Sequence, residues 1–273
     1  MALKLMYITN NENVARIAEK SGVDIIFIDL EVNGKHQRQG HLDTVISMHS
    51  ISDIPKVKSV LRKAKLLVRV NPIYENSQKE IESVISNGAD IVMLPFFSTT
   101  KEVEKFIGIV DGRAITCLLV ETPSAVNNID EILSVDGIDM IHIGLNDLHL
   151  GCGMKFMFEP LADGTVDMLC KKFQEQDITY GFGGIARLCQ GLLPAEHIVA
   201  EHYRLGSSMA ILSRSFVNTG NSYNDDEIKW IFINGVKEIR DYERSLCDMD
   251  ISYFEENHQV VISKVKEIVE GAS

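Results

Sequence analysis

The chain has 273 residues, of which 45% are hydrophobic and 24% are charged, a composition typical of a globular protein. Its net charge of −12 argues against a nucleic-acid surface, although a local arginine or metal can still bind an anionic small molecule. No apolar run approaches the ~20 residues of a membrane span, the N-terminus lacks the pattern of a signal peptide, and the five cysteines form no CxxC pair. We therefore expect a cytoplasmic protein without disulfides or structural zinc.

A strand followed by a helix is predicted eight times along the chain. Apolar runs bounded by polar, glycine or proline residues predict strands at 3–9, 24–30, 65–71, 90–96, 114–121, 137–147, 179–186 and 207–216. Strict alternation of this kind gives right-handed crossovers and a parallel sheet, and a closed barrel of eight units needs ~250 residues. No GxGxxG follows the first strand, which weakens a dinucleotide-binding interpretation. We predict an α/β protein with a single (β/α)8 TIM barrel over residues 1–248.

One more amphipathic helix is predicted in the C-terminal extension, residues 249–273. Val261, Val265, Ile268 and Val269 form its apolar stripe. A barrel does not require this helix, so two placements stay open. It either seals the bottom of the barrel or packs on a partner subunit.

Two acidic residues stand where predicted strands end. Glu121 closes the run AITCLLVE, and Asp147 closes the run GIDMIHIGLND. Because buried strands of this kind end at the rim, both acids are expected where TIM barrels place their chemistry. Two carboxylates at that rim indicate a divalent cation such as Mg²⁺ or Mn²⁺. The alternative is that each acid caps the helix that follows it.

Three more charged residues end neighbouring strands. Arg69, in KLLVRVNP, is expected to point into the barrel mouth, where it binds a substrate carboxylate or forms a salt bridge with a neighbouring acid. Asp29 and Glu31, in FIDLE, lie on one face of the second strand because side chains alternate. One or both are candidates to orient metal-bound water, and Glu31 is also a candidate substrate-binding residue.

Backbone groups at two strand ends are further candidates for ligand contacts. The N–H groups of Asn146 and Asp147 turn out of a strand and can hold an anionic oxygen. The three glycines of GFGG (181–184) either permit close approach of a ligand or form a tight bend at the rim.

Five segments of the chain resemble a known family. FIDLE, VRVNP, GADIVMLPFF, LLVETPSAVNNIDEIL and IHIGLNDLHLG, in this order and spacing, resemble the HpcH/HpaI aldolase and citrate lyase β-subunit family, over roughly residues 3–220. The resemblance implies a metal-dependent aldolase of the pyruvate type on a (β/α)8 barrel. It also implies a homo-oligomer, from dimer to hexamer, in which subunits exchange C-terminal helices.

The resemblance also implies roles for individual residues. Glu121 and Asp147 would bind a divalent metal, Mg²⁺, Mn²⁺ or Co²⁺. Arg69 would bind the carboxylate and oxo group of pyruvate or its enolate. The amides of Asn146 and Asp147 would hold the carboxylate.

The chain departs from both branches of this family. Val32 stands where the hydroxy-oxoacid aldolases have an acid/base histidine, directly after the glutamate of the second-strand motif. Leu119 stands where those aldolases have a glutamine, two residues before the metal-binding glutamate. The citrate lyase branch tends to read DLED, whereas this chain reads DLEV.

The loop after the second predicted strand offers replacements for the absent histidine. His36 and His41 lie in this loop, and either is a candidate for the proton transfer, as is a metal-bound hydroxide. Lys35 and Arg38 of the same loop are candidates to bind a charged second substrate.

The expected reaction joins or separates a pyruvate-like oxo acid and an aldehyde. The metal would acidify the pyruvate methyl group, and Arg69 would stabilise the enolate that adds to the aldehyde. A Schiff-base mechanism would need a lysine inside the barrel, and Lys65, at a strand start, lies at the wrong end. Two other functions stay open: a CoA-ester lyase of the citryl or malyl type, and a catalytically silent barrel that binds an oxo acid or serves in an assembly.

Overall fold

The computed structural model describes residues 2–33, 49–213, 216–217 and 223–271. Parallel strands from these residues close into a barrel in the order β1 to β8, with β8 paired to β1. The strands are β1 (Lys4–Ile8), β2 (Ile25–Asp29), β3 (Lys65–Arg69), β4 (Ile91–Leu94), β5 (Ile115–Val120), β6 (Met140–Ile143), β7 (Thr179–Ile185) and β8 (Met209–Leu212). The predicted (β/α)8 barrel is confirmed.

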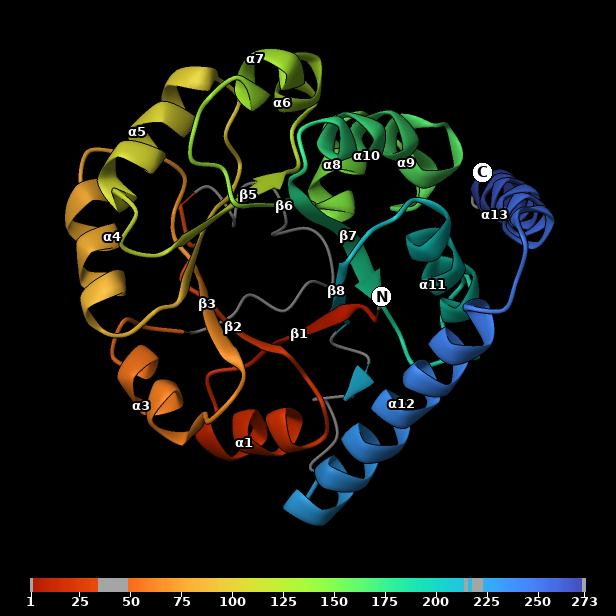
Figure 1. Cartoon of the computed structure of the whole chain (residues 1–273), viewed down its shortest axis with the longest axis horizontal. Coiled ribbons are helices and arrows are strands. Elements are labelled where there is room, and N and C mark those ends of the chain that lie inside the picture. The colour runs from red at the N-terminus through yellow and green to blue at the C-terminus, as the bar shows by residue number, and fades with distance from the viewer. Residues whose placement is uncertain (1, 34–48, 214–215, 218–222, 272–273) are drawn as a thin grey trace.

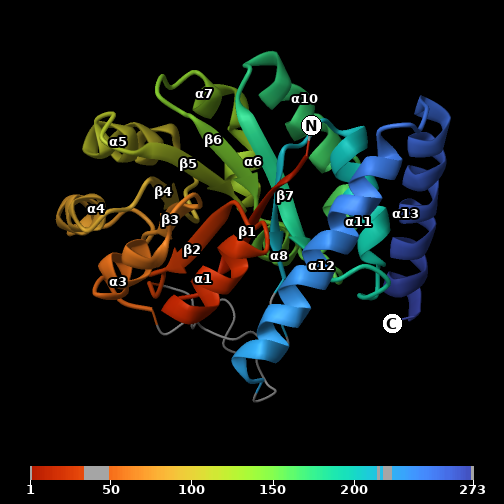
Figure 2. The same ribbon diagram turned by 60° about the horizontal axis from the view of Figure 1, so that its bottom comes forward.

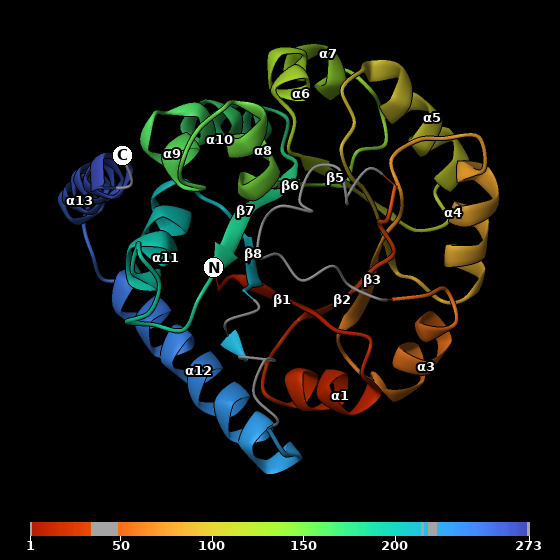
Figure 3. The same cartoon turned by 180° about the vertical axis from the view of Figure 1, so that it is seen from behind.

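Helices surround this barrel on its outside, as Figures 1 and 3 show from its two ends. They are α1 (Glu12–Lys20), α3 (Asp53–Val60), α4 (Ser77–Ser86), α5 (Thr100–Val110), α6 (Pro123–Asn127), α7 (Ile129–Leu133), α8 (Leu145–Gly151), α9 (Glu159–Ala162), α10 (Thr165–Glu175), α11 (Ala195–Arg204), α12 (Asp225–Leu246) and α13 (Ile251–Gly271). Among the residues that the structure describes, no helix is long and apolar enough to cross a membrane.

The alternation of side chains divides the core into two parts. Ile25 and Phe27 of β2 belong to a buried cluster inside the barrel, whereas Ile26 and Ile28 belong to the larger cluster between the strands and the helices. The next inward-facing position of β2 is Asp29, because successive residues of a strand point to opposite faces. The same alternation brings Arg69 inward two residues after Leu67. Charged side chains therefore replace apolar ones at the carboxyl ends of these strands.

The sixth strand is shorter than the sequence predicts. It ends at Ile143, and the residues from Leu145 onward form α8, so Asp147 lies in the first turn of a helix and not at the end of a strand. The chain turns at Gly144, whose N–H still donates to the carbonyl of Val120 on β5 (2.9 Å). Asp147 is thus displaced from β6 but stays at the same rim as Glu121.

The glycines of β7 have a structural use. Between Gly181 and Gly184 the pairing of β7 with β8 shifts register, as in a β-bulge. A side chain at Gly181 would lie 2.0 Å from the carbonyl oxygen of Met209, so only glycine permits the two strands to pair this closely. Of the two uses that the sequence left open for these glycines, the structure therefore shows a tight bend, which is part of the barrel wall.

The C-terminal helix α13 packs on the outer side of the barrel against α9 and α11 (Figures 1 and 2). Val261 and Val265 of its predicted stripe are buried there. The buried carboxylate of Glu201 on α11 accepts hydrogen bonds from Asn257 (2.9 Å) and pairs with His258 (2.9 Å). Within the chain, α13 thus covers a flank of the barrel and not its bottom. Its packing on a partner subunit stays a prediction.

Candidate functional site

Glu121 is a buried carboxylate at the carboxyl end of β5. Only 2% of its surface is exposed, and its Oε1 accepts a hydrogen bond from the backbone N–H of Phe96 (3.0 Å). Its other oxygen lies against Gly144, because a Cβ atom at that position would lie 2.7 Å from Oε2. The turn between β6 and α8 therefore has to be glycine to leave room for this carboxylate.

Asp147 faces the same space from the first turn of α8. Its exposed fraction is 8%, and it lines a cavity of about 260 Å³ together with Glu121. Phe96, Pro123 and Leu150 complete much of the wall. In the described ranges no group of three or more histidine, cysteine, aspartate or glutamate side chains is close enough to hold a metal. The cavity therefore offers two carboxylates, and other ligands would have to come from water or substrate.

The electrostatics of this pair favour a cation. Burial raises the pKa of Glu121 well above its usual value, Arg69 opposes this effect, and the negative charges of Asp147 and Glu31 raise that pKa further. A bound divalent cation would offset both the burial and the repulsion between the carboxylates. Hard oxygen ligands are also those that Mg²⁺ and Mn²⁺ prefer. The donor set thus fits the predicted metal.

Arg69 is held at the barrel mouth by two acids. Its Nε and Nη2 donate to the two carboxylate oxygens of Asp29, both at 2.9 Å, and Nη2 lies 3.4 Å from Glu31. Burial opposes the charge of Arg69, but Asp29 and Glu31 outweigh it and raise the pKa, to which Glu121 also contributes. The guanidinium also lies over the ring of Phe27, 5.6 Å from its centre. The salt bridge that the sequence left open is therefore present.

This pairing leaves one edge of the guanidinium for a ligand. Nε and Nη2 are engaged with Asp29, whereas Nη1 makes no hydrogen bond within the part of the chain that is described. The side chain of Arg69 is 12% exposed, and that of Asp29 is fully buried. Arg69 is thus fixed in direction by its acids and still reachable from the mouth.

His49 supports this arrangement from the loop after β2. Its Nδ1 accepts a hydrogen bond from the backbone N–H of Asp29 (3.0 Å), so in the neutral ring the proton lies on Nε2. His49 carries no local signal in the sequence, since it lies 20 residues from its partner and outside the predicted strands and helices.

His142 is a buried polar residue inside the barrel wall. It lies on β6 opposite Leu119 of β5, and its Nε2 is 3.0 Å from the carbonyl oxygen of Gly183. A carbonyl only accepts, so Nε2 carries the proton and donates. Burial lowers the pKa of His142 to about 4, so the ring is neutral at pH 7. His142 gives no separate signal in the sequence, because it stands inside an apolar run that predicts a core strand.

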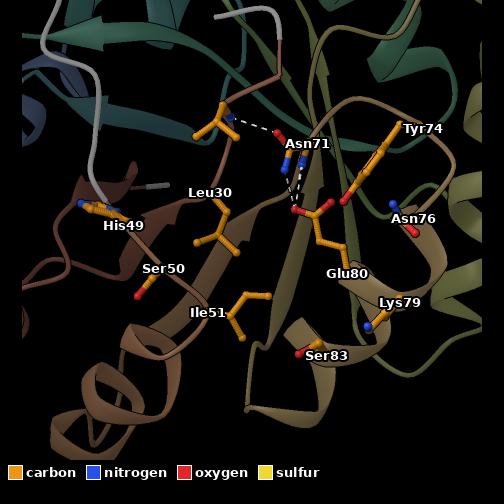
Figure 4. Close-up of a pocket in the computed structure, with 11 residues that line it drawn as sticks. Leu30, His49, Ser50, Ile51, Asn71, Tyr74, Asn76, Lys79, Glu80 and Ser83 are labelled. Atoms are coloured by element: carbon orange, nitrogen blue, oxygen red, sulfur yellow. Dashed lines mark hydrogen bonds between the residues drawn. The ribbon is translucent and has the colours of Figure 1, made fainter.

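A second pocket of about 400 Å³ lies beside the residues that follow β2 and β3 (Figure 4). The side-chain oxygen of Asn71 accepts hydrogen bonds from the backbone N–H groups of Val32 and Asn33 (2.9 Å each). The amide nitrogen of Asn71 in turn donates to the carboxyl group of Glu80 on α4 (2.7 Å). Burial raises the pKa of Glu80. This chain of contacts links α4 to Val32, the position at which the family resemblance implies an acid/base histidine.

The predicted site residues thus fall into three groups. Glu121 and Asp147 share one cavity, and Arg69 and Glu31 lie close enough for their charges to act on Glu121. Asn146 is half-buried in the first turn of α8, next to Asp147. His36 and His41, with Lys35 and Arg38, lie outside the described residues.

A family model describes much of this sequence. The model of the HpcH/HpaI aldolase/citrate lyase family matches residues 4–157, which include Glu31, Arg69, Glu121 and Asp147. No curated protein matches the sequence.

Solved structures share the fold at low sequence identity. An HpcH/HpaI aldolase from Desulfitobacterium hafniense DCB-2 superposes with a TM-score of 0.60 at 16% identity, covering 78% of this chain and 86% of that one. An HpcH/HpaI aldolase/citrate lyase family protein from Burkholderia cenocepacia J2315 gives a TM-score of 0.63 at 12% identity, with 80% and 91% covered. The citrate synthase SbnG gives 0.59 at 15% identity, with 80% and 89% covered.

Proposed function

The chain belongs to the HpcH/HpaI aldolase/citrate lyase family, and from this premise we propose that it is a divalent-metal-dependent aldolase. It forms or cleaves a 4-hydroxy-2-oxo acid through a pyruvate enolate. The observation that carries this proposal is the pair of buried carboxylates, Glu121 and Asp147, facing one cavity beside a fixed arginine.

Glu121 and Asp147 are the residues that would hold the metal. Mg²⁺, Mn²⁺ or Co²⁺, when bound, supplies Lewis acidity that acidifies the pyruvate methyl group. Glu121 is fixed for this task by the N–H of Phe96, and Gly144 leaves room for its second oxygen. The Glu121 carboxylate is thus oriented before any ligand arrives.

Arg69 binds the oxo acid and stabilises the enolate oxygen as its charge develops. Its Nη1 edge donates to the ligand while Asp29 holds the opposite edge. Because the side chain is 12% exposed, water screens this interaction only weakly. The first-turn amides of Asn146 and Asp147 are the further donors that we propose for the carboxylate.

The proton that leaves the pyruvate methyl group needs a base. His49 does not suit this task, because its Nδ1 already accepts from Asp29 and its Nε2 carries the proton. His49 is better placed to donate a hydrogen bond. His36 and His41 stay our candidates for the proton transfer.

The partners that we propose are a pyruvate-like oxo acid, an aldehyde and further copies of the same chain. All five cysteines are free, which supports a reducing compartment such as the cytoplasm. We expect the assembled form to be a homo-oligomer between dimer and hexamer.

The test is exchange of the pyruvate methyl protons in D₂O, followed by NMR. The reaction is run with Mg²⁺, Mn²⁺ or Co²⁺ and again after a chelator is added, and it needs no knowledge of the aldehyde. We expect metal-dependent exchange that is lost in Glu121→Ala and Asp147→Ala. Glu104→Ala, an exposed acid on α5, is the matched control and should exchange like the unchanged protein.

Absence of exchange with every metal, in protein that is folded and oligomeric, would contradict the enolate proposal. A CoA-ester lyase or a silent oxo-acid-binding barrel would then explain the family membership better. Equal loss of exchange in Glu104→Ala would point to damaged folding and not to the metal site.

A further inference from the structure

Two lysines occupy inward-facing positions at the end of the barrel opposite Glu121. Lys4 precedes Met6 by two residues, and Lys65 precedes Leu67 by two, and both apolar residues belong to the cluster inside the barrel. Because side chains alternate along a strand, Lys4 and Lys65 face the barrel axis. They stand at the starts of β1 and β3, the end where the N-terminus lies in Figure 2.

These lysines line a pocket at that end of the barrel. Its volume is about 420 Å³, and Lys63 adds a third ammonium group to its rim. The floor is apolar and consists of Ile25, Ile91, Ile115 and Met140. The pocket therefore combines a positive rim with a surface that suits the carbon skeleton of a ligand.

The positive charge of this rim is not neutralised by ion pairs. No carboxylate of the described residues lies within salt-bridge distance of Lys4, Lys63 or Lys65, whereas Lys58 on α3 pairs with Asp90 at 2.5 Å. In a chain with a net charge of −12, such a rim stands out from the average surface. It attracts small anions, because a concave surface with an apolar floor concentrates the field of its charges.

Two aspartates also line the pocket, but each has partners of its own. Asp24 accepts hydrogen bonds from the N–H of Leu5 (2.9 Å) and from Arg240 (3.1 Å). Asp139 accepts from the backbone N–H of Thr116 (2.8 Å) and from its hydroxyl (3.1 Å). Arg240 offsets the charge of Asp24, and Thr116 holds the carboxylate of Asp139 at the start of β5, so three lysines face one carboxylate that has no cationic partner among the described residues.

The number and type of the cations indicate the kind of anion. Lysine is a compact point charge with three donors, so three lysines around one pocket suit an anion that carries several charges and oxygens, as a phosphate group does. All three cations on the rim are lysines. We propose that this pocket is a second ligand site, in which Lys4, Lys63 and Lys65 bind a small phosphorylated molecule. The site lies at the far end of the barrel from the proposed chemistry and does not depend on it.

The test is a titration of the full chain with pyrophosphate, followed by methyl NMR and by calorimetry. The methyl groups of Ile25, Ile91, Ile115 and Met140 report on the floor of the pocket. We expect saturable shifts of these signals, and at least a tenfold loss of affinity in the double variant Lys4→Gln/Lys65→Gln. The matched control is Lys101→Gln/Lys105→Gln on α5, which removes two exposed charges elsewhere and should bind like the unchanged protein.

Three results would overturn the proposal. The first is the absence of saturable shifts at the pocket floor. The second is equal weakening in both double variants, which would mean attraction by overall charge only. The third is binding that shifts methyl groups near Glu121 and leaves the pocket floor unchanged. Because the lysines are exposed, the variants should fold, and unfolding curves check this.

Discussion

At the scale of single residues, the site depends on buried charges that hold one another. Arg69 is directed by Asp29, and Glu121 by the amide of Phe96. Neither acid is exposed enough for water to replace these partners. Changes to one member of such a pair are therefore expected to affect both stability and chemistry.

Asp29→Asn removes the charge that faces Arg69 and keeps the size of the side chain. We expect a loss of about 3 kcal/mol in the free energy of unfolding, because a buried cation loses its principal partner. Exchange of the pyruvate methyl protons should also slow, since Arg69 is no longer held in one direction. Urea unfolding measures the first effect. Asp241→Asn, in the exposed pair with Lys237, is the control, and a similar loss there would contradict the role of burial.

Glu80 predicts a dependence of stability on pH. Its folded-state pKa is raised by burial, so the folded protein binds a proton that the unfolded chain has already released. Stability should therefore fall as pH rises from the usual carboxyl pKa of 4.5 up to the raised value, and then level off. Unfolding curves across this range, compared with Glu80→Gln, test the sign. The variant keeps an acceptor for Asn71 and should lose this part of the pH dependence.

At the scale of elements, the junction between β6 and α8 determines the metal site. The strand stops early, and Gly144 turns the chain so that Asp147 of α8 faces the same cavity as Glu121. The β7 bulge and the placement of α13 on α11 are likewise properties of how elements meet.

Gly144→Ala should damage the metal site and also lower stability, because the added Cβ would lie 2.8 Å from the Cβ of Glu121, an atom fixed to the backbone. The new Cβ would lie 2.7 Å from Oε2 of Glu121, so the carboxylate has to move. We expect cation affinity, measured by calorimetry with Mn²⁺, to fall at least about tenfold. Gly108→Ala in α5 is the control, because nothing lies within 4 Å of the added atom, and helix propensity favours alanine by about 1 kcal/mol. Unchanged Mn²⁺ affinity in Gly144→Ala would count against Glu121 as a ligand.

At the scale of the whole molecule, metal binding should stabilise the barrel. A ligand present at 100 times its dissociation constant stabilises the folded state by about 2.7 kcal/mol. For a chain of this length, that corresponds to a rise in Tm of roughly 5–10 °C. We expect Mn²⁺ to produce such a rise, a chelator to reverse it, and Glu121→Ala to abolish it. An equal rise in Glu121→Ala would place the cation elsewhere.

Much of the fold follows from the sequence alone. Each apolar run of β1 to β8 signals its strand without reference to distant residues, and eight alternations leave a closed barrel as the simplest parallel arrangement. The ends of the apolar runs indicated that Glu121 and Arg69 stand at the rim, because the end of such a run is a local property of the sequence. The predicted sixth strand, residues 137–147, was too long, because periodicity alone does not show that the chain turns at Gly144 and continues as a helix.

The tertiary structure alone decided how these residues are paired. Arg69 and Asp29 are 40 residues apart in the chain, and Asn71 reaches back 39 residues to Val32. Such contacts arise from strand register and loop closure, which leave no periodic signal in the chain. The same reason explains why His49 and His142 were passed over and why α13 lies on α11. Local patterns determined the barrel and its polar rim, and three-dimensional packing determined which charges meet there.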